Sequence, residues 1–264
     1  MTPEDVISFR RDGALPLRGV LDPEQVALLE AGVERTLAEP GPLAIRTQDE
    51  GAPGAFFEDF CAWQRIPEFE RVIRGSRLAA IAGALTESTR IRLFHDHVLV
   101  KEPGTTTRTP WHQDQPYYCI DGAQNVSFWV PLDPVPREST LEFVAGSHAG
   151  GVWHMPRTFV EGTPMVFEPG TLTEVPDVEA DRFAYDIVGW ELEPGDAVAF
   201  HMLTLHAAAG SRTRRRAFSL RLIGDDVTFA PRPHRSSPPF PGLDAELAAG
   251  RPLDHRLFPV LWEC

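Results

Sequence analysis

Few cysteines occur in this chain, and they lie far apart. The three cysteines are Cys61, Cys119 and Cys264, and no two of them form a C-x-x-C pair. This spacing argues against a disulfide framework and against a zinc ribbon, and it suits a reducing compartment. We therefore expect a cytoplasmic protein.

Positive charge is scarce, and long apolar runs are missing. Lysine and arginine together number 25 against 38 acidic residues, so the net charge is −13. A field of this sign repels nucleic acid and anionic membranes, and neither is an expected partner. No apolar run is long enough to span a bilayer, and the N-terminal stretch MTPEDVISFRRDG lacks the apolar core of a signal peptide.

The length and composition are those of one sizeable globular unit. The chain has 264 residues, of which 42% are hydrophobic and 24% are charged. We expect a single domain, 1–264, that buries a core of its own. Within it, the residue patterns predict a mostly helical part over 1–90, a strand-rich core over 91–230 and a C-terminal wrap over 231–264.

Helix signals dominate the first part of the chain. Residues 2–13 begin with Thr2 as an N-cap, and residues 21–39 begin with Asp22 and continue with apolar residues at helical spacing. Residues 76–88 are rich in alanine and predict a further helix.

Strand signals dominate the middle of the chain. Five strand-like segments are separated by glycine and proline turns: 91–102, 125–134, 141–148, 196–208 and 215–224. Helices followed by strands predict a mainly β fold with flanking helices, built on an antiparallel double-sheet core such as a jelly roll. The irregular stretch 150–187 is too long for a simple connection and is expected to be a lid over a site, or else a surface insertion.

The segment TPWHQDQPYYC contains two good metal ligands at close spacing. If this segment is an extended strand, His112 and Asp114 point to the same side. His206, near the end of a later strand-like segment, is the expected third ligand. Two imidazoles and one carboxylate on one side of an ion leave three positions open, which suits non-haem Fe(II) chemistry with O2 and a chelating co-substrate.

A dicarboxylate co-substrate needs an anchor for its far carboxylate. Arginine is the best residue for this task, because its planar guanidinium can contact both carboxylate oxygens. Strand alternation puts four residues of the segment after His206 on one face: Arg215, Ala217, Ser219 and Arg221. We expect Arg215 to be the anchor. Each of these signals is weak alone, and their order along the chain makes the metal site the preferred interpretation.

A second face of alternating residues precedes the metal motif. It comprises Leu93, His95, His97, Leu99 and Lys101. We expect this face to line the pocket and to contact substrate or co-substrate, with solvent exposure as the alternative. His201 alternates away from His206, so we expect a structural role for it.

The stretch PWHQDQPYYCIDGAQNVSFWVPLDPVPRESTLEFVAGSH resembles the core of the phytanoyl-CoA dioxygenase family of Fe(II)/2-oxoglutarate oxygenases. The resemblance extends to VLVKEPG before it and to LHAAAGSRTRRRAFSLR and LFPVLW after it. It implies a double-stranded β-helix (cupin-like), iron bound by His112, Asp114 and His206, and 2-oxoglutarate whose distal carboxylate contacts Arg215. It also implies that Trp129 packs near the co-substrate.

Strand alternation places Ser127 on the same face as Trp129, and Leu99 is the remaining residue expected beside the co-substrate. Two departures from the family pattern matter. Alanines follow His206 where the family often has Gly-Ser, and the shorter distance to the arginines leaves Arg214, Arg215 and Arg216 as alternatives. Related halogenases replace the carboxylate ligand by a small residue, so an intact Asp114 favours hydroxylation.

The substrate is expected to be a small metabolite, perhaps a positively charged one, because an acidic chain offers little to the phosphates of CoA. The candidate substrate contacts are His95, His97, Gln115, Tyr117, Trp153 and Arg157. The chain has no G-x-S-x-G nucleophile elbow and no phosphate-binding glycine motif. The alternative is a cupin-like metal protein without oxygenase activity, such as a sensor, a binding module or an isomerase. No sequence signal indicates the oligomeric state.

Overall fold

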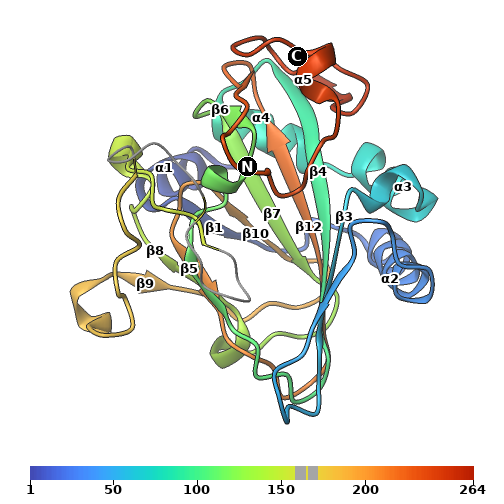
Figure 1. Ribbon diagram of the computed structural model, residues 1–264, viewed down its shortest axis with the longest axis vertical. Helices are drawn as coiled ribbons and strands as arrows, with labels where there is room; N and C mark the ends of the chain where they lie inside the picture. Colours follow the sequence, from blue (N-terminus) through green and yellow to red (C-terminus); the bar gives the residue numbers. More distant parts are fainter. Residues whose placement is uncertain (158–164, 166–171) are drawn as a thin grey trace.

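The computed structural model describes residues 1–157, 165 and 172–264, and it is mainly β (Figure 1). Five α-helices are found in these residues: α1 (Pro3–Asp12), α2 (Pro23–Ala38), α3 (Pro67–Gly75), α4 (Leu78–Thr86) and α5 (Leu243–Glu246). Short 3-10 helices are η1 (Ala62–Gln64), η2 (Gln115–Tyr117), η3 (Arg137–Ser139), η4 (Ala149–Gly151) and η5 (Arg182–Ala184). Among the described residues, no helix has the length and hydrophobicity of a membrane span.

The predicted helix caps are confirmed. Thr2 forms a capping box with Asp5 at the start of α1, and Asp22 forms one with Gln25 at the start of α2. Gly13 ends α1 with φ 74°, a left-handed conformation that glycine adopts without strain. The helix predicted over 76–88 is present as α4, whereas α3 was not predicted.

A large antiparallel sheet forms one wall of the molecule. Its strands run in the order β1-β10-β7-β12-β4-β3-β2, with β14 paired to β4. Their bounds are β1 (Ala14–Leu17), β2 (Ile45–Thr47), β3 (Phe56–Phe60), β4 (Arg90–Lys101), β7 (Asn125–Pro131), β10 (Ala197–Phe200), β12 (Arg215–Ile223) and β14 (Val260–Glu263). Strands β1 to β3 come from the part of the chain predicted to be mostly helical, and β14 comes from the predicted C-terminal wrap.

A smaller antiparallel sheet lies opposite the large one. Its order is β5-β11-β8-β9, with bounds β5 (Thr109–His112), β8 (Leu141–Val144), β9 (Ile187–Val188) and β11 (His206–Ala208). A separate pair joins β6 (Ile120–Asp121) to β13 (Thr228–Phe229). The segment predicted as one strand over 196–208 is in fact two, β10 and β11, which lie in different sheets.

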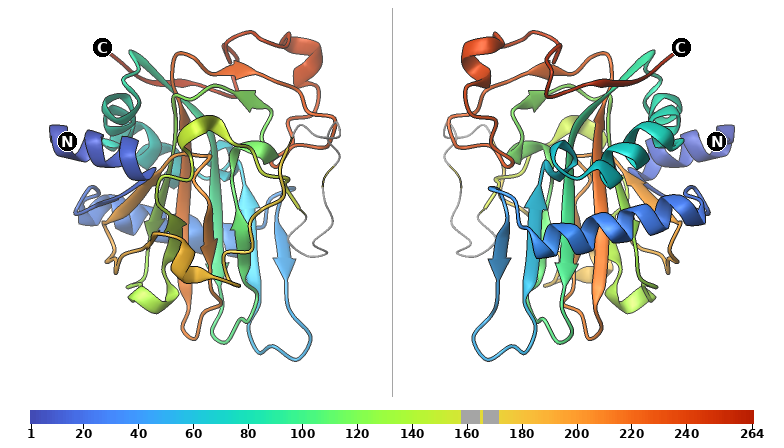
Figure 2. Two further views of the ribbon diagram at one scale, coloured as in Figure 1. Left: turned by 90° about the vertical axis from the view of Figure 1, so that its left-hand side faces the viewer. Right: turned by 90° about the vertical axis from the view of Figure 1, so that its right-hand side faces the viewer.

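Helices cover the outer face of the large sheet, and α2 lies across its strands (Figure 2). Along β12 the even residues point into this helix layer, where Phe218 packs against Phe69 of α3 at 4.6 Å between ring centroids. The main core therefore lies between helices and sheet. The odd residues of β12 point the other way, toward the smaller sheet, as the alternation of a strand requires.

The lid predicted over 150–187 is only partly visible, because residues 158–164 and 166–171 lie outside the described part of the chain. The described portion contains η5 and β9, and β9 pairs with β8 of the smaller sheet. At the other end of the chain, β14 follows α5 and pairs with β4.

Candidate metal centre

A cavity open to solvent lies between the two sheets. The smaller sheet contributes His112 and His206 to its wall, and the large sheet contributes alternating residues of three adjacent strands. These are Phe56, Glu58 and Phe60 of β3; His97, Leu99 and Lys101 of β4; and Arg215, Ala217, Ser219 and Arg221 of β12. The inward face predicted for β12 is thus the face that lines the cavity.

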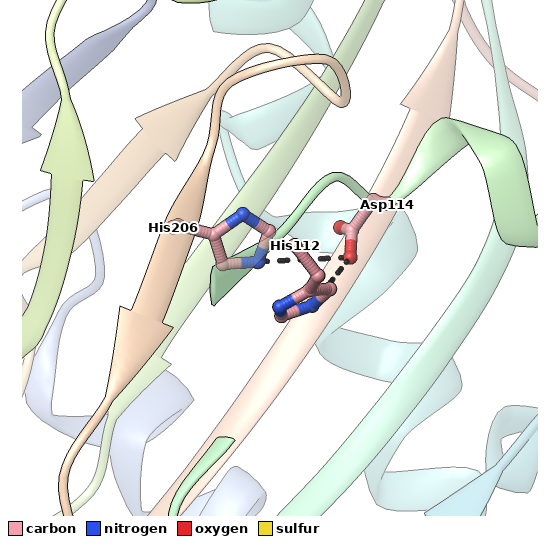
Figure 3. Close-up of side chains that lie close together, drawn as sticks. All are labelled: His112, Asp114 and His206. Atoms are coloured by element: carbon pink, nitrogen blue, oxygen red, sulfur yellow. Dashed lines mark ion pairs between the residues drawn. The ribbon is translucent and has the colours of Figure 1, made fainter. Parts of the chain in front are cut away.

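Three predicted ligands meet at one point of this cavity (Figure 3). His112 ends β5, His206 begins β11, and the two residues are direct cross-strand partners. Asp114 Oδ1 lies 3.6 Å from His112 Nε2 and 3.7 Å from His206 Nε2. One ligand atom from each residue lies within 4.8 Å of the others, and all three residues are buried.

The route by which Asp114 reaches this point differs from the prediction. Strand β5 ends at His112, and Asp114 has helical dihedrals, φ −72° and ψ −46°, at the start of η2. The backbone N–H groups of Asp114 and Gln115 both donate to the carbonyl of Met202, at 2.8 and 3.0 Å. A turn fixed by these hydrogen bonds, rather than alternation along one strand, brings the carboxylate beside the imidazole.

Backbone carbonyls orient both imidazoles. Nδ1 of His112 lies 2.8 Å from the carbonyl of Pro110, and Nδ1 of His206 lies 2.9 Å from the carbonyl of Thr204. Since only a protonated Nδ1 can donate to a carbonyl, each Nε2 keeps its lone pair for a metal. Burial, with a contribution from nearby His112, lowers the pKa of His206 to about 3, so its imidazole is the neutral form that binds metals.

The two carboxylate oxygens of Asp114 have different neighbours: Oδ1 faces the two imidazoles, and Oδ2 contacts other side chains. Its Oδ2 accepts hydrogen bonds from Ser127 Oγ at 3.1 Å and from Arg221 at 3.2 Å. Burial alone would raise the pKa of Asp114, but the charge of Arg221 acts against it, and that pKa lies well below its usual range. Asp114 is therefore ionised, as a metal ligand must be.

The sequence did not predict that Ser127 and Arg221 would contact Asp114. Ser127 was predicted to lie beside the co-substrate, and it instead supports Asp114. The guanidinium of Arg221 is buried and also donates to the hydroxyl of Tyr118 at 3.1 Å. The sequence signal that could have identified Arg221 as a residue of the site was its alternation with Arg215 along β12.

Arg215 is the arginine of its cluster that faces the cavity. Its side chain is buried, donates to the carbonyl of Ser139 and lies 5.8 Å from the ring of Trp129. By contrast, Arg214 pairs with Glu34, and Arg216 pairs with Asp133. The structure thus distinguishes the three alternatives by position, and it places the predicted neighbours Trp129 and Leu99 on the cavity wall.

Lys101 is the single lysine of the chain, and it lies opposite Arg215 in the register of β4 and β12. Its Nζ donates to the carbonyls of Thr107 and Ala209, each at 2.8 Å. Burial, together with the charge of Arg215, lowers the pKa of Lys101 to about 6. Sequence reasoning placed it on the correct face but did not assign it to the site.

Two of the six predicted substrate contacts, His97 and Tyr117, line the cavity. His95 is fully buried instead, with Nδ1 3.2 Å from the carbonyl of Asp96, and Gln115 donates to the carbonyl of Gly122 at 2.8 Å. The structure does not bring the remaining two to the cavity wall: Trp153 stacks on Arg232, and Arg157 pairs with Glu174. His201 also lies outside the cavity, with Nε2 3.0 Å from the carbonyl of Ala123.

The donor set fits one group of metals. Two imidazoles and one carboxylate on the same side of a point, with open space on the other side, match the facial ligand set of non-haem iron. The buried guanidinium of Arg215 on the same wall suits a dicarboxylate that chelates the metal. The residues present therefore fit both iron and 2-oxoglutarate.

Comparisons with known proteins agree with this fit. A model of the phytanoyl-CoA dioxygenase family (PhyH) matches residues 9–218. An ectoine dioxygenase from Stutzerimonas stutzeri (strain A1501) is 26% identical, over 96% of this chain and 86% of that protein. A probable phytanoyl-CoA dioxygenase from Caenorhabditis elegans is 21% identical over 78% of this chain, which spans only 63% of that protein.

Solved structures are similar over nearly the whole chain. The non-heme alpha ketoglutarate dependent epimerase SnoN from nogalamycin biosynthesis has a TM-score of 0.76 and 26% identity, covering 98% of this chain and 97% of that one. The same epimerase has been solved with Fe3+, alpha ketoglutarate and nogalamycin RO. EctD from S. alaskensis, with a TM-score of 0.69, 20% identity and coverage of 96% and 85%, supports the fold alone.

The antiparallel sheets and the buried donor set define a class of protein, the non-haem oxygenases that use iron and 2-oxoglutarate. Within that class, the chain belongs to the phytanoyl-CoA dioxygenase family.

Proposed function

We propose that this protein hydroxylates a small molecule, with iron bound by His112, Asp114 and His206 and with 2-oxoglutarate consumed in the reaction. The observation that carries the proposal is the meeting of three predicted ligands within 4.8 Å of one another, in a cavity whose wall also holds Arg215. An intact carboxylate ligand supports hydroxylation rather than halogenation, which needs a free position in its place.

We also propose a fold, a domain organisation and a location for this protein. The facing arrangement of the larger and smaller antiparallel sheets, with the cavity between them, supports a double-stranded β-helix of the jelly-roll kind. It forms one domain over 1–264, since strands from both ends of the chain join the large sheet. The three free cysteines support a reducing, cytoplasmic location.

The roles of the residues follow from their positions. Iron together with 2-oxoglutarate supplies the oxidising power, because it activates O2. Arg215 orients the co-substrate by its distal carboxylate, with Lys101 beside it. Arg221 and Ser127 hold Oδ2 of Asp114, so that Oδ1 faces the imidazoles.

The walls of the cavity are rich in aromatic side chains. Aromatic side chains contribute much of the lining: Phe56, Phe60, Tyr117, Tyr118, Trp129 and Phe200. An apolar wall around a reactive centre limits side reactions with solvent and strengthens the electrostatic contacts inside it. The substrate is therefore expected to be small enough to share this space with 2-oxoglutarate.

Release of succinate from 2-oxoglutarate tests this function. Wild-type protein with Fe(II), O2 and a panel of small metabolites should release succinate, and Asp114→Ala should abolish the release because the anionic ligand is lost. Asp254→Ala removes an exposed carboxylate that pairs with Arg92, and it should leave the rate unchanged. Metal binding without any succinate release across the panel would instead favour a cupin-like protein that is not an oxygenase.

A further inference from the structure

The inward face of β3 carries a carboxylate between two aromatic rings. Phe56, Glu58 and Phe60 alternate toward the cavity, and all three line it. Glu58 is only 8% exposed. The roles proposed for the metal and for 2-oxoglutarate leave this carboxylate without a task.

Glu58 has a single polar partner among the described residues. Its Oε1 lies 3.2 Å from Nε2 of His97, and the ring of His97 stacks on Phe60 with centroids 3.9 Å apart. Burial lowers the pKa of His97, although Glu58 raises it in part, so the imidazole is neutral near neutral pH. A neutral imidazole lies beside the carboxylate but does not neutralise its charge.

The cations of the cavity are engaged elsewhere. Arg221 contacts Asp114 and Tyr118, and Arg215 donates to the carbonyl of Ser139. Lys101 lies near enough for Glu58 to influence its pKa, but its side-chain nitrogen donates to two backbone carbonyls, and burial lowers that pKa to about 6. Glu58 is thus a nearly buried carboxylate without a cationic partner among the residues that the structure describes, an arrangement that costs free energy until a partner arrives.

The register of the sheet places the carboxylate of Glu58 to one side of the position expected for the co-substrate. Arg215 and Lys101 face each other at one end of β12 and β4. Glu58 lies opposite Leu99, one inward position from that pair, and its partner His97 lies opposite Ser219, one inward position from Arg221. Strand β3 lies on the far side of β4 from β12, so it is roughly 10 Å from the strand that carries the anchor. Glu58 therefore faces the space that 2-oxoglutarate leaves for a substrate.

We infer that Glu58, positioned by His97, recognises a protonated amine on the substrate. This inference rests on the proposed function and narrows it to small molecules with a cationic nitrogen. The substrate cation would neutralise the charge of Glu58. It would also make charge-assisted hydrogen bonds, which are among the strongest polar contacts in a buried site. Because the carboxylate is fixed, the same contact would also orient the carbon to be oxidised.

Matched pairs of small probes test the inference by binding alone. Cyclohexylamine is compared with cyclohexanol, and benzylamine with benzyl alcohol, by anaerobic titration of protein loaded with Fe(II) and 2-oxoglutarate. At least one amine should bind about tenfold more tightly than its alcohol. Glu58→Gln, which keeps the shape of the side chain, should weaken amine binding about tenfold and alcohol binding less than about twofold.

Two controls separate this inference from the proposed function. Glu70→Gln changes an exposed carboxylate of α3 that pairs with Arg74, and it should leave both affinities as in the wild type. The absorption band of the Fe(II)–2-oxoglutarate complex should be present in all three proteins. If the band is present but amines bind no better than alcohols, or do not bind at all, or if Glu58→Gln keeps the amine preference, the inference is wrong and the proposed function stands. A missing band contradicts the proposed function itself.

Discussion

The guanidinium of Arg221 decides how Asp114 is presented to a metal. It contacts Oδ2 at 3.2 Å and leaves Oδ1 toward the two imidazoles. In Arg221→Met the buried carboxylate loses its cation, so the pKa of Asp114 rises. Fe(II) and Co(II) should then bind about tenfold or more weakly, and the loss should grow as pH falls, because the proton competes with the metal.

Anaerobic Co(II) titrations at two pH values measure this effect. Arg214→Met is the matched control, because Arg214 is on the same strand-forming segment but pairs with Glu34 at the surface. Unchanged metal affinity in Arg221→Met would show that Ser127 alone is sufficient to hold the carboxylate.

Arg215 separates co-substrate binding from metal binding. In Arg215→Ala the distal carboxylate of 2-oxoglutarate loses its charged partner, so the 2-oxoglutarate concentration for half-maximal turnover should rise about tenfold or more. The iron requirement should change far less, since Arg215 is not a ligand. Arg214→Ala and Arg216→Ala should resemble the wild type, and equal effects on iron and 2-oxoglutarate in Arg215→Ala would contradict the anchor role.

Lys101 makes 2-oxoglutarate binding depend on pH. Its pKa of about 6 means that the free protein holds it mainly neutral at about pH 7. A bound dicarboxylate favours the ammonium and raises that pKa, so binding should take up on the order of one proton at about pH 7, and affinity should fall as pH rises. Calorimetry in buffers of different ionisation enthalpy measures the uptake. Lys101→Met should abolish it, and an uptake that persists in this variant would exclude Lys101 as the source.

At the scale of the element, α2 shows what a cap contributes. Asp22 accepts from the backbone N–H of Gln25 at 2.8 Å at the start of the helix that crosses the outer face of the large sheet. Asp22→Ala should lower the free energy of unfolding by about 1 kcal/mol in urea denaturation. Because α2 is on the face away from the cavity, iron and 2-oxoglutarate binding should be unchanged, and a weakened site would mean that α2 also supports the metal centre.

Elements with local signals were predictable from the sequence, and elements without them were not. Caps at Thr2 and Asp22, the alternation of β12 and that of β4 from His97 to Lys101 are properties of consecutive residues, so the sequence contains them. The predicted alternation of β4 is wrong at Leu93, which packs in the main core because the pairing with β12 shifts register between Leu93 and His95. The turn that carries Asp114 depends on the carbonyl of Met202, far along the chain, and no local pattern predicts it. The short strand β3 was missed for a similar reason, since it pairs with β4 at a distance in sequence.

At the scale of the whole molecule, the candidate site is a product of sheet register. His112 and His206 are cross-strand partners in one sheet, whereas Arg215 and Arg221 come from the opposite one. The sequence predicted the triad and Arg215 because their residue types and order are informative. It did not predict that Glu58 lines the cavity, or that Leu93, His95 and Gln115 do not, because those outcomes depend on packing between distant segments.

The most direct test of the account is anaerobic absorption of the metal-free protein with Fe(II), before and after 2-oxoglutarate is added. A weak visible charge-transfer band that requires both components is predicted, because 2-oxoglutarate would chelate an iron held by His112, Asp114 and His206. A protein that binds iron but gives no band with 2-oxoglutarate, or that binds no metal at all, would contradict the assignment of this cavity to an oxygenase.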